Sequence, residues 1–156
     1  MLEVCDILLV RGHTLKADAI RDLTADGAPY ATSYNHVGIY AGNNQVYDAL
    51  VADGITLHEL NYNPYDVFRI QMTDLQKQKV LEYCNSKVGT KYGKIQMVEE
   101  AIVEIFHIPL TINMGNDEWC STFIVHAIAI GAGILITRKP LAVPNDIGWS
   151  VITQPI

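Results

Sequence analysis

Residues 33–40 read Ser33-Tyr34-Asn35-His36-Val37-Gly38-Ile39-Tyr40, and Glu118-Trp119-Cys120-Ser121-Thr122 opens an apolar run much later in the chain. The first stretch alternates like a strand that begins at a histidine. The second has the spacing of a helix that begins at a cysteine. A cysteine and a histidine are the two halves of a thiolate–imidazolium nucleophile. If the two stretches meet in the fold, they predict a cysteine hydrolase.

Size and composition predict one compact domain over residues 1–156. The chain is 49% hydrophobic and 18% charged, which is typical of an ordinary globular protein and argues against disorder. Its formal net charge is −6. Because no basic stripe is available to replace phosphate counterions, we expect no nucleic-acid partner.

Neither a membrane segment nor a leader is expected from the sequence. No stretch reaches the roughly 18–20 apolar residues that a spanning helix needs. Met1 is followed by Leu-Glu-Val-Cys-Asp, with no basic and then apolar region typical of a secretory signal. The chain as written is therefore expected in the cytoplasm.

The three cysteines, Cys5, Cys84 and Cys120, are widely spaced. They form no C-x-x-C pair and no Cys/His cluster at zinc spacing, so we expect no metal, no disulfide framework and no cofactor. Cys5 and Cys84 are predicted to be small buried hydrophobic residues.

Hydrophobic periodicity and turn residues predict a mixture of strands and helices, and hence a single α+β domain. The predicted strands lie in residues 3–10, in two runs of 36–50 around the turn Ala41-Gly42-Asn43-Asn44, in 55–60 and in 67–72. Helices are predicted at residues 15–23, after a capping box at 73–76, at 94–106 and at 119–130. In the helix after the capping box, the residues predicted to face inward are Val80, Leu81, Cys84 and Val88. In the helix at 119–130 they are Phe123, Ile124, Ala127 and Ile128. The tail with Pro140, Pro144 and Pro155 is expected to be irregular.

Cys120 lies where a helix would activate it. It follows Asn116-Asp117-Glu118, residues suited to a helix start, and the positive end of a helix favours the thiolate form. Amides of the first turn would also point toward an oxyanion on a substrate carbonyl. The alternative is a buried helix cysteine that packs beside Trp119.

His36 needs a third group that orients its ring, and Asp48 on the returning strand is the best candidate. His36 and Gly38 share one face of their strand, whereas Val37 and Ile39 share the other. Asp48 falls on the face of His36 only if the hairpin loop holds an odd number of residues. Alternatively, His36 is an ordinary hydrogen-bonded strand histidine and Asp48 a solvated carboxylate.

The remaining histidines are expected to play no part in such a site. His126 is six positions beyond Cys120, which places it well around the helix and away from the thiol. His13, His58 and His107 have no partner at a meaningful spacing and are expected to be surface or loop residues.

Several stretches together resemble one enzyme family. Asn35–Gly42 resembles the histidine strand of the NlpC-like papain-fold hydrolases, residues 88–93 resemble the segment before their nucleophile, and Trp119-Cys120-Ser121 resembles the nucleophile itself. In ordinary members the cysteine precedes the histidine strand, whereas here it follows. This order is similar to that of the circularly permuted YiiX-like branch, which is distantly akin to the lecithin:retinol acyltransferase group. Residues 6–10 and 143–146 resemble further family segments, so the resemblance spans nearly the whole chain.

The resemblance implies a fold and a set of roles. The fold would be papain-like, of the permuted NlpC type, with an antiparallel sheet or half-barrel packed against helices. Cys120 would be the nucleophile, His36 the general base and later acid, and Asp48 the orienting group. Tyr92 would support the oxyanion, although it also reads as an ordinary aromatic core residue. The chain departs from the family at Cys5, where glycine is common, and at Asp48, where Glu is frequent.

The implied activity is hydrolysis of an amide or peptide bond, in a cell-wall peptide or an isopeptide-like substrate. A lipid ester or acyl substrate at the same site is one alternative, and a non-catalytic binding or structural module on the same fold is another. A wall-directed substrate would require export or delivery in a phage particle. Residues 94–118 are expected to be a packed helix, with a lid or specificity element as the alternative.

Overall fold

A computed structural model describes residues 1–11, 34–50, 53–90, 119–137, 144–148, 150 and 154–155. The helices predicted at residues 15–23 and 94–106 lie outside these residues. So do Tyr92, His13, His107 and the helix-start residues 116–118.

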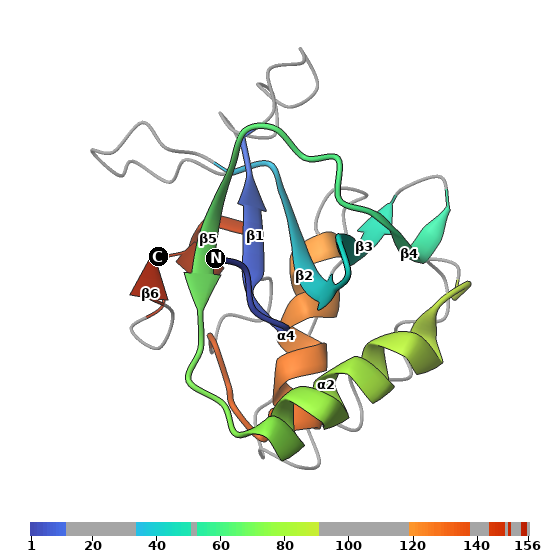
Figure 1. The fold of residues 1–156 in the computed structure, drawn as a ribbon, viewed down its shortest axis with the longest axis vertical. Helices are drawn as coiled ribbons and strands as arrows, with labels where there is room; N and C mark the ends of the chain where they lie inside the picture. Colours follow the sequence, from blue (N-terminus) through green and yellow to red (C-terminus); the bar gives the residue numbers. More distant parts are fainter. Residues whose placement is uncertain are drawn as a thin grey trace.

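The described residues form one antiparallel sheet with helices, an α+β arrangement (Figure 1). The strands are β1 (Ile7–Val10), β2 (His36–Gly42), β3 (Gln45–Leu50), β4 (Gly54–Glu59), β5 (Tyr65–Arg69) and the two-residue β6 (Gln154–Pro155). Their order across the sheet is β4-β3-β2-β1-β5-β6, and each neighbouring pair runs antiparallel. Strand β4 therefore lies at one edge and β6 at the other.

Three helices complete the described part of the chain: α2 (Asp74–Lys87), α4 (Trp119–Ala132) and the short α5 (Pro144–Gly148). Helix α4 packs against β2, β3 and α2. In Figure 1, α4 lies behind the strands and α2 crosses the lower part of the view. No helix among the described residues has both the length and the apolar character needed to cross a bilayer.

One hydrophobic cluster joins the sheet to α4. The four residues predicted to face inward from α4 (Phe123, Ile124, Ala127 and Ile128) are all buried in it, which confirms that prediction. Cys5 and Cys84 are also buried there as free thiols, as predicted.

The hairpin between β2 and β3 contains an extra residue. Ile39 pairs with Tyr47 and Tyr40 with Val46, but Gly42 then pairs with Gln45, so Ala41 is left unpaired in a bulge. The turn itself is Asn43-Asn44, with φ of 50° and 58°, the left-handed conformation that suits a two-residue hairpin. Five residues thus separate Tyr40 from Val46, and the loop is odd. One step along the ladder, Asp48 lies opposite Gly38, on the face that carries His36.

Helix α2 begins at the predicted capping box. The Thr73 hydroxyl accepts a hydrogen bond from the Gln76 amide, and the Gln76 side chain accepts one from the Thr73 amide. The Gln76 side-chain nitrogen also donates to the carbonyl of Ala132, 2.8 Å away, where α4 ends. A Cβ at Gly131 would lie 2.6 Å from the Cα of Val80, so only glycine lets α4 approach α2 this closely.

Three local predictions need correction. Val88 was expected inside the helix, but α2 ends at Lys87, and Val88 is the C-cap and 44% exposed. Strand β5 covers Tyr65–Arg69 rather than residues 67–72. The tail is not irregular throughout, because Pro144 opens helix α5 and Pro155 belongs to β6. Proline suits the first position of a helix and the edge of a sheet, and both places occur here.

The N-terminal turn is anchored at Cys5 and Asp6. Cys5 has φ of 69°, a left-handed conformation that favours glycine, at the position where the family resemblance expects glycine. Its amide donates to the Tyr40 carbonyl, 2.9 Å away. The buried Asp6 carboxylate binds Arg69 of β5 through two hydrogen bonds of 2.7 and 2.8 Å. This geometry holds the start of β1 against both of its neighbouring strands.

In each edge strand, part of the backbone that faces away from the sheet is not available to a further strand. In β4 the amide of Ile55 donates to the Thr90 carbonyl at 3.1 Å, and its carbonyl accepts from the Gly89 amide at 2.8 Å. At the opposite edge, Pro155 of β6 pairs with Phe68.

Candidate active site

His36 and Cys120 come from elements that meet in the core. His36 is the first residue of β2, and Cys120 is the second residue of α4. Charge and hydrogen-bond interactions with Cys120 both contribute to raising the pKa of His36, so the two side chains lie close together. Cys120 is only 5% exposed, whereas 20% of the His36 side chain reaches solvent. A thiol in the first turn of a helix thus lies close to an imidazole at the start of a strand.

Asp48 holds the other side of the imidazole. Its Oδ2 lies 2.8 Å from Nε2 of His36, and its side chain is fully buried. Its Oδ1 accepts a hydrogen bond of 2.9 Å from the hydroxyl of Thr56, which pairs with Asp48 across β3 and β4. The bulge at Ala41 is what turns Asp48 to this face of the sheet.

The charges of the three groups support one another. Burial alone would lower the pKa of His36, but the negative charge of Cys120 and the hydrogen bond to Asp48 outweigh it and raise the pKa to about 10. Burial would raise the pKa of Asp48, but the hydrogen bond and positive charge of His36 lower it to about 2. The geometry therefore favours an ionised Asp48 beside a protonated His36.

Tyr62 was not identified from the sequence, and the structure places it in the site. Its hydroxyl donates to Oδ2 of Asp48 and lies 3.1 Å from Nε2 of His36. The two rings meet edge to face, with centroids 5.5 Å apart. Burial and the charge of Asp48 raise the pKa of Tyr62 well above its ordinary value, so it remains a donor.

Gly38 makes room for this arrangement. A Cβ at this position would lie 2.6 Å from Cγ2 of Val46 and 3.3 Å from the ring of Tyr62. A side chain at this position would therefore clash with Val46 and crowd the ring of Tyr62 beside His36. The glycine of the His-Val-Gly pattern is thus a packing requirement of the site.

His58 corrects the prediction that it is a surface or loop residue without a partner. It lies in β4, and its Nε2 is 3.1 Å from Oδ2 of Asp48. The alternation of Thr56 and His58 on one face of a strand was a signal for this placement. That alternation predicts a contact between His58 and Asp48 only when the strand register is known. Asp48 pairs directly with Thr56, and His58 lies two residues further along β4, so its contact with Asp48 runs diagonally between the strands.

His126 differs from His36 and His58 in that its pKa is lowered. It is 2% exposed, and burial lowers its pKa to about 4, with the charge of Lys87 acting in the same direction. It is therefore a neutral histidine at physiological pH.

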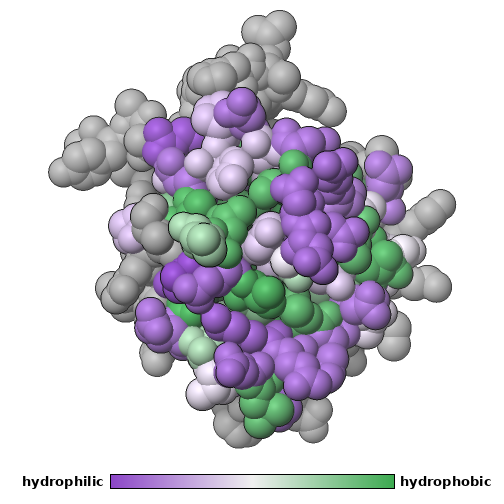
Figure 2. Space-filling view, viewed as in Figure 1, coloured by the Kyte–Doolittle hydropathy of each residue, from purple (hydrophilic) through white to green (hydrophobic). Residues whose placement is uncertain are grey.

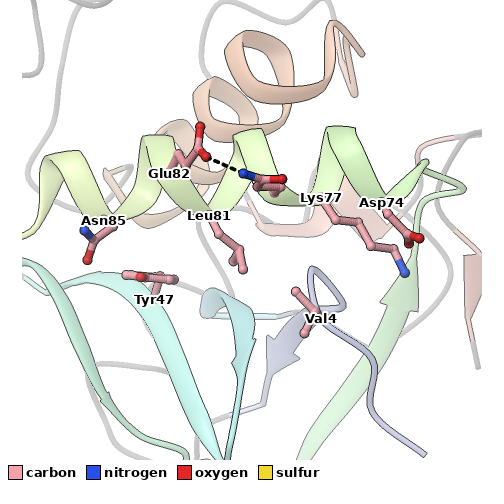
Figure 3. Close-up of a pocket in the computed structure, with 8 residues that line it drawn as sticks. Val4, Tyr47, Asp74, Lys77, Leu81, Glu82 and Asn85 are labelled. Atoms are coloured by element: carbon pink, nitrogen blue, oxygen red, sulfur yellow. Dashed lines mark hydrogen bonds between the residues drawn. The ribbon is translucent and has the colours of Figure 1, made fainter.

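Two surface hollows among the described residues are lined by neither His36 nor Cys120. A groove of about 490 Å³ runs between α2 and the strands, where Figure 3 shows Leu81 of α2 pointing toward Tyr47 and Val4. Figure 2 shows an apolar strip beside α2, whose outer surface is polar. A second hollow, of about 590 Å³, follows β4 and is lined in part by Thr56 and His58, the two β4 residues that bind Asp48.

The structure thus brings together Cys120, His36 and Asp48, and it adds Thr56, Tyr62 and His58 around Asp48. Tyr92, the remaining predicted site residue, lies outside the described residues.

A comparison with solved structures finds a similar fold. The crystal structure of the metalloprotein YiiX from Escherichia coli O157:H7 matches 99% of this chain and 96% of its own, with a TM-score of 0.69 and 13% sequence identity. At this identity the likeness is one of fold, and the chain has a YiiX-like fold. No protein-family model and no curated protein matches the sequence.

Proposed function

We propose that this protein is a cysteine hydrolase that cleaves an amide or peptide bond, with Cys120 as nucleophile. One observation carries the proposal. The thiol lies close enough to His36 to raise the pKa of its imidazole, and Nε2 of the same ring is held by the buried carboxylate of Asp48. This is the arrangement that cysteine and serine hydrolases use on unrelated folds.

Each group has a defined role in this reaction. Because Nε2 of His36 is engaged by Asp48, Nδ1 is the nitrogen left for the thiol. The Cys120 sulfur attacks the substrate carbonyl, and protonated His36 gives its proton to the leaving amine. Water then attacks the thioester while His36 takes a proton from it, which releases the carboxylic acid and restores the Cys120 thiolate beside a protonated His36. First-turn amides of the 14-residue helix α4 are suited to stabilise the oxyanion.

The finer family assignment and the substrate belong to the same proposal. Two findings support a permuted NlpC-type domain over residues 1–156: the YiiX-like fold, and the order of elements in this chain, where the histidine strand β2 precedes the cysteine helix α4. The resemblance favours a cell-wall peptide or an isopeptide-like amide as substrate.

The structural neighbour is called a metalloprotein, which raises the question of whether the residues of this site fit a metal ion. Among the described residues, no group of three or more His, Cys, Asp or Glu side chains could hold a metal ion. Asp48 accepts hydrogen bonds from the hydroxyls of Thr56 and Tyr62 and faces two histidine nitrogens, so its oxygens are already engaged. The described residues of this site therefore do not fit a metal ion.

Alkylation of the thiols as a function of pH tests the proposal. We expect iodoacetamide to modify Cys120 at pH 6, and the His36→Ala variant to lose that reactivity at least tenfold, because a thiol without an imidazolium partner is mostly protonated there. Cys5 and Cys84 serve as internal controls, since burial raises the pKa of Cys5 to about 12 and that of Cys84 further. Modification of Cys120 only at alkaline pH, with or without His36, would contradict the proposal.

The bond cleaved is tested with two substrate sets. We expect release of amines from peptidoglycan peptides or isopeptides, lost in Cys120→Ala while the fold is retained. Hydrolysis of acyl esters alone would contradict the amide assignment but keep the nucleophile. Labelling of Cys120 without turnover of any amide or ester would indicate a binding module.

A further inference from the structure

His58 makes two contacts that a neutral imidazole cannot make together. Its Nδ1 lies 2.8 Å from the backbone carbonyl of Glu59, and its Nε2 lies 3.1 Å from Oδ2 of Asp48. A carbonyl and a carboxylate only accept hydrogen bonds, and a neutral imidazole carries one N–H. In either neutral tautomer, one lone pair of the ring would face an oxygen lone pair. Both contacts therefore require the imidazolium form.

We infer that His58 is a positioning residue that acts as a cation. Protonated His58 donates to Asp48 from the β4 side and competes with His36 for the same carboxylate oxygen. When His58 loses its proton, it releases Asp48. This inference rests on the proposed function, because it concerns the regulation of the same site. His58 acts through Asp48 and His36 and does not itself touch the reacting atoms.

The charges around His58 support this role. In the reactive state of the proposed mechanism, a Cys120 thiolate, a protonated His36 and an ionised Asp48 carry one net negative charge, which a cationic His58 balances. Burial lowers the pKa of His58, but the hydrogen bonds to Glu59 and Asp48 outweigh it and raise the pKa above 6.5, against the like charge of His36. The side chain is 27% exposed and lines the hollow along β4, so protons can exchange with solvent.

The other groups that face His58 are few among the described residues. From β3 it meets Asp48, from β2 the charge of His36, and from the segment after β4 the ring of Tyr62, edge to face at 6.0 Å. On its own strand the carboxylate of Glu59 binds the side chain of Asn44, and Asp53 lines the same hollow. Asp48 is the group in hydrogen-bonding contact with Nε2, and it is the one that His58 positions.

A charged His58 has a consequence for His36. Because the two rings share Oδ2 of Asp48 and carry like charges, protonated His58 makes the proton of His36 easier to lose. His36 must give this proton to the leaving amine. His58 therefore prevents Asp48 from making His36 too weak an acid.

NMR titration of the imidazole rings tests the inference without relying on activity. In the unaltered chain we expect the two ring nitrogens of His58 to show the shifts of an imidazolium at pH 6.5, and Asp48→Asn to abolish this state. In His58→Gln we expect the pKa of His36 to rise by about half a unit or more, because a like charge has been removed. Glu59→Gln is the matched control, since it removes a neighbouring charge that does not touch Asp48, and it should leave His36 unchanged.

The two proposals fail separately in this experiment. A neutral His58 at pH 6.5 in the unaltered chain would overturn the inference, even if His58→Gln failed to fold, and would leave the nucleophile untouched. An unchanged His36 titration in folded His58→Gln would also overturn it. Loss of the proposed function would appear instead as a Cys120 whose alkylation does not depend on His36.

Discussion

At the scale of single residues, the imidazole of His36 is subject to opposing influences. Burial disfavours its charged form, whereas the negative charges of Cys120 and Asp48 favour it more strongly. Burial and the same negative charges raise the pKa of Tyr62, so its phenol stays protonated and donates a hydrogen bond to Asp48. A small set of contacts therefore fixes where each proton lies before any substrate arrives.

Replacement of His36 should change stability in a way that depends on pH. The folded-state pKa of about 10 lies above the ordinary 6.5, so the stabilisation is complete below pH 6.5 and is lost as the pH rises through 10. We expect His36→Asn to cost on the order of 2 kcal/mol near pH 6 and much less near pH 10. Urea denaturation of both proteins at several pH values measures the difference. A cost that grows with pH would contradict the assigned charge.

Replacement of Asp48 should slow the reaction without unfolding the chain. Asp48→Asn removes the carboxylate that holds Nε2 of His36, and we expect turnover to fall on the order of 100-fold or more. Thr56→Val is the matched control, because it removes a hydrogen bond to the other oxygen of Asp48 and leaves the charge. We expect it to cost less than tenfold. Steady-state kinetics on an amide substrate, or thiol alkylation at pH 7, gives both values. Equal losses in the two variants would argue against the role of the charge.

At the scale of elements, the sequence predicted what local chemistry determines. The hairpin followed from Gly42 and Asn43, and the start of α2 followed from Thr73 and Gln76, because turns and caps are specified within a few residues. Helix α5 was missed because the prolines of the tail led us to expect an irregular segment, although proline also suits a first helical position, as at Pro144. His58 and Tyr62 were missed because their contacts with Asp48 depend on strand register and on a loop, which no local pattern encodes.

Because α2 and α4 approach closely at Gly131, we expect replacement of this glycine to change stability in the direction opposite to that expected from helix propensity. In an isolated helix, Gly131→Ala would stabilise by about 1 kcal/mol. Here the added Cβ would lie 2.6 Å from the backbone of Val80, which cannot yield as a side chain can. We expect Gly131→Ala to destabilise the protein by about 1–3 kcal/mol. Thermal or urea denaturation measures the change, and a gain in stability would show that the helices can separate at little cost.

At the scale of the whole molecule, the candidate site depends on segments far apart in sequence. His36 and Cys120 come from the beginning of a strand and of a helix that pack in one core. The sequence predicted both elements and their approximate faces. It left the position of Asp48 open, because the parity of the hairpin depends on whether Ala41 is bulged, and a bulge costs too little to be read from composition.

One shared core predicts one unfolding transition. Strands β1 to β5 and helices α2 and α4 contribute buried residues to a single cluster, so we expect them to unfold together. Far-ultraviolet circular dichroism and tryptophan fluorescence should give coincident urea midpoints. Two separated transitions would contradict the proposal that residues 1–156 are one domain.

The two edges of the sheet affect how readily the folded protein aggregates at high concentration. Pro155 carries no amide hydrogen and cannot template a further strand, and at Ile55 the outward amide and carbonyl are already taken by Thr90 and Gly89. Intermolecular strand recruitment, the first event of fibrillation, is thus hindered at both of these positions. A crowded solution of the folded chain should remain dispersed rather than seed ordered aggregates.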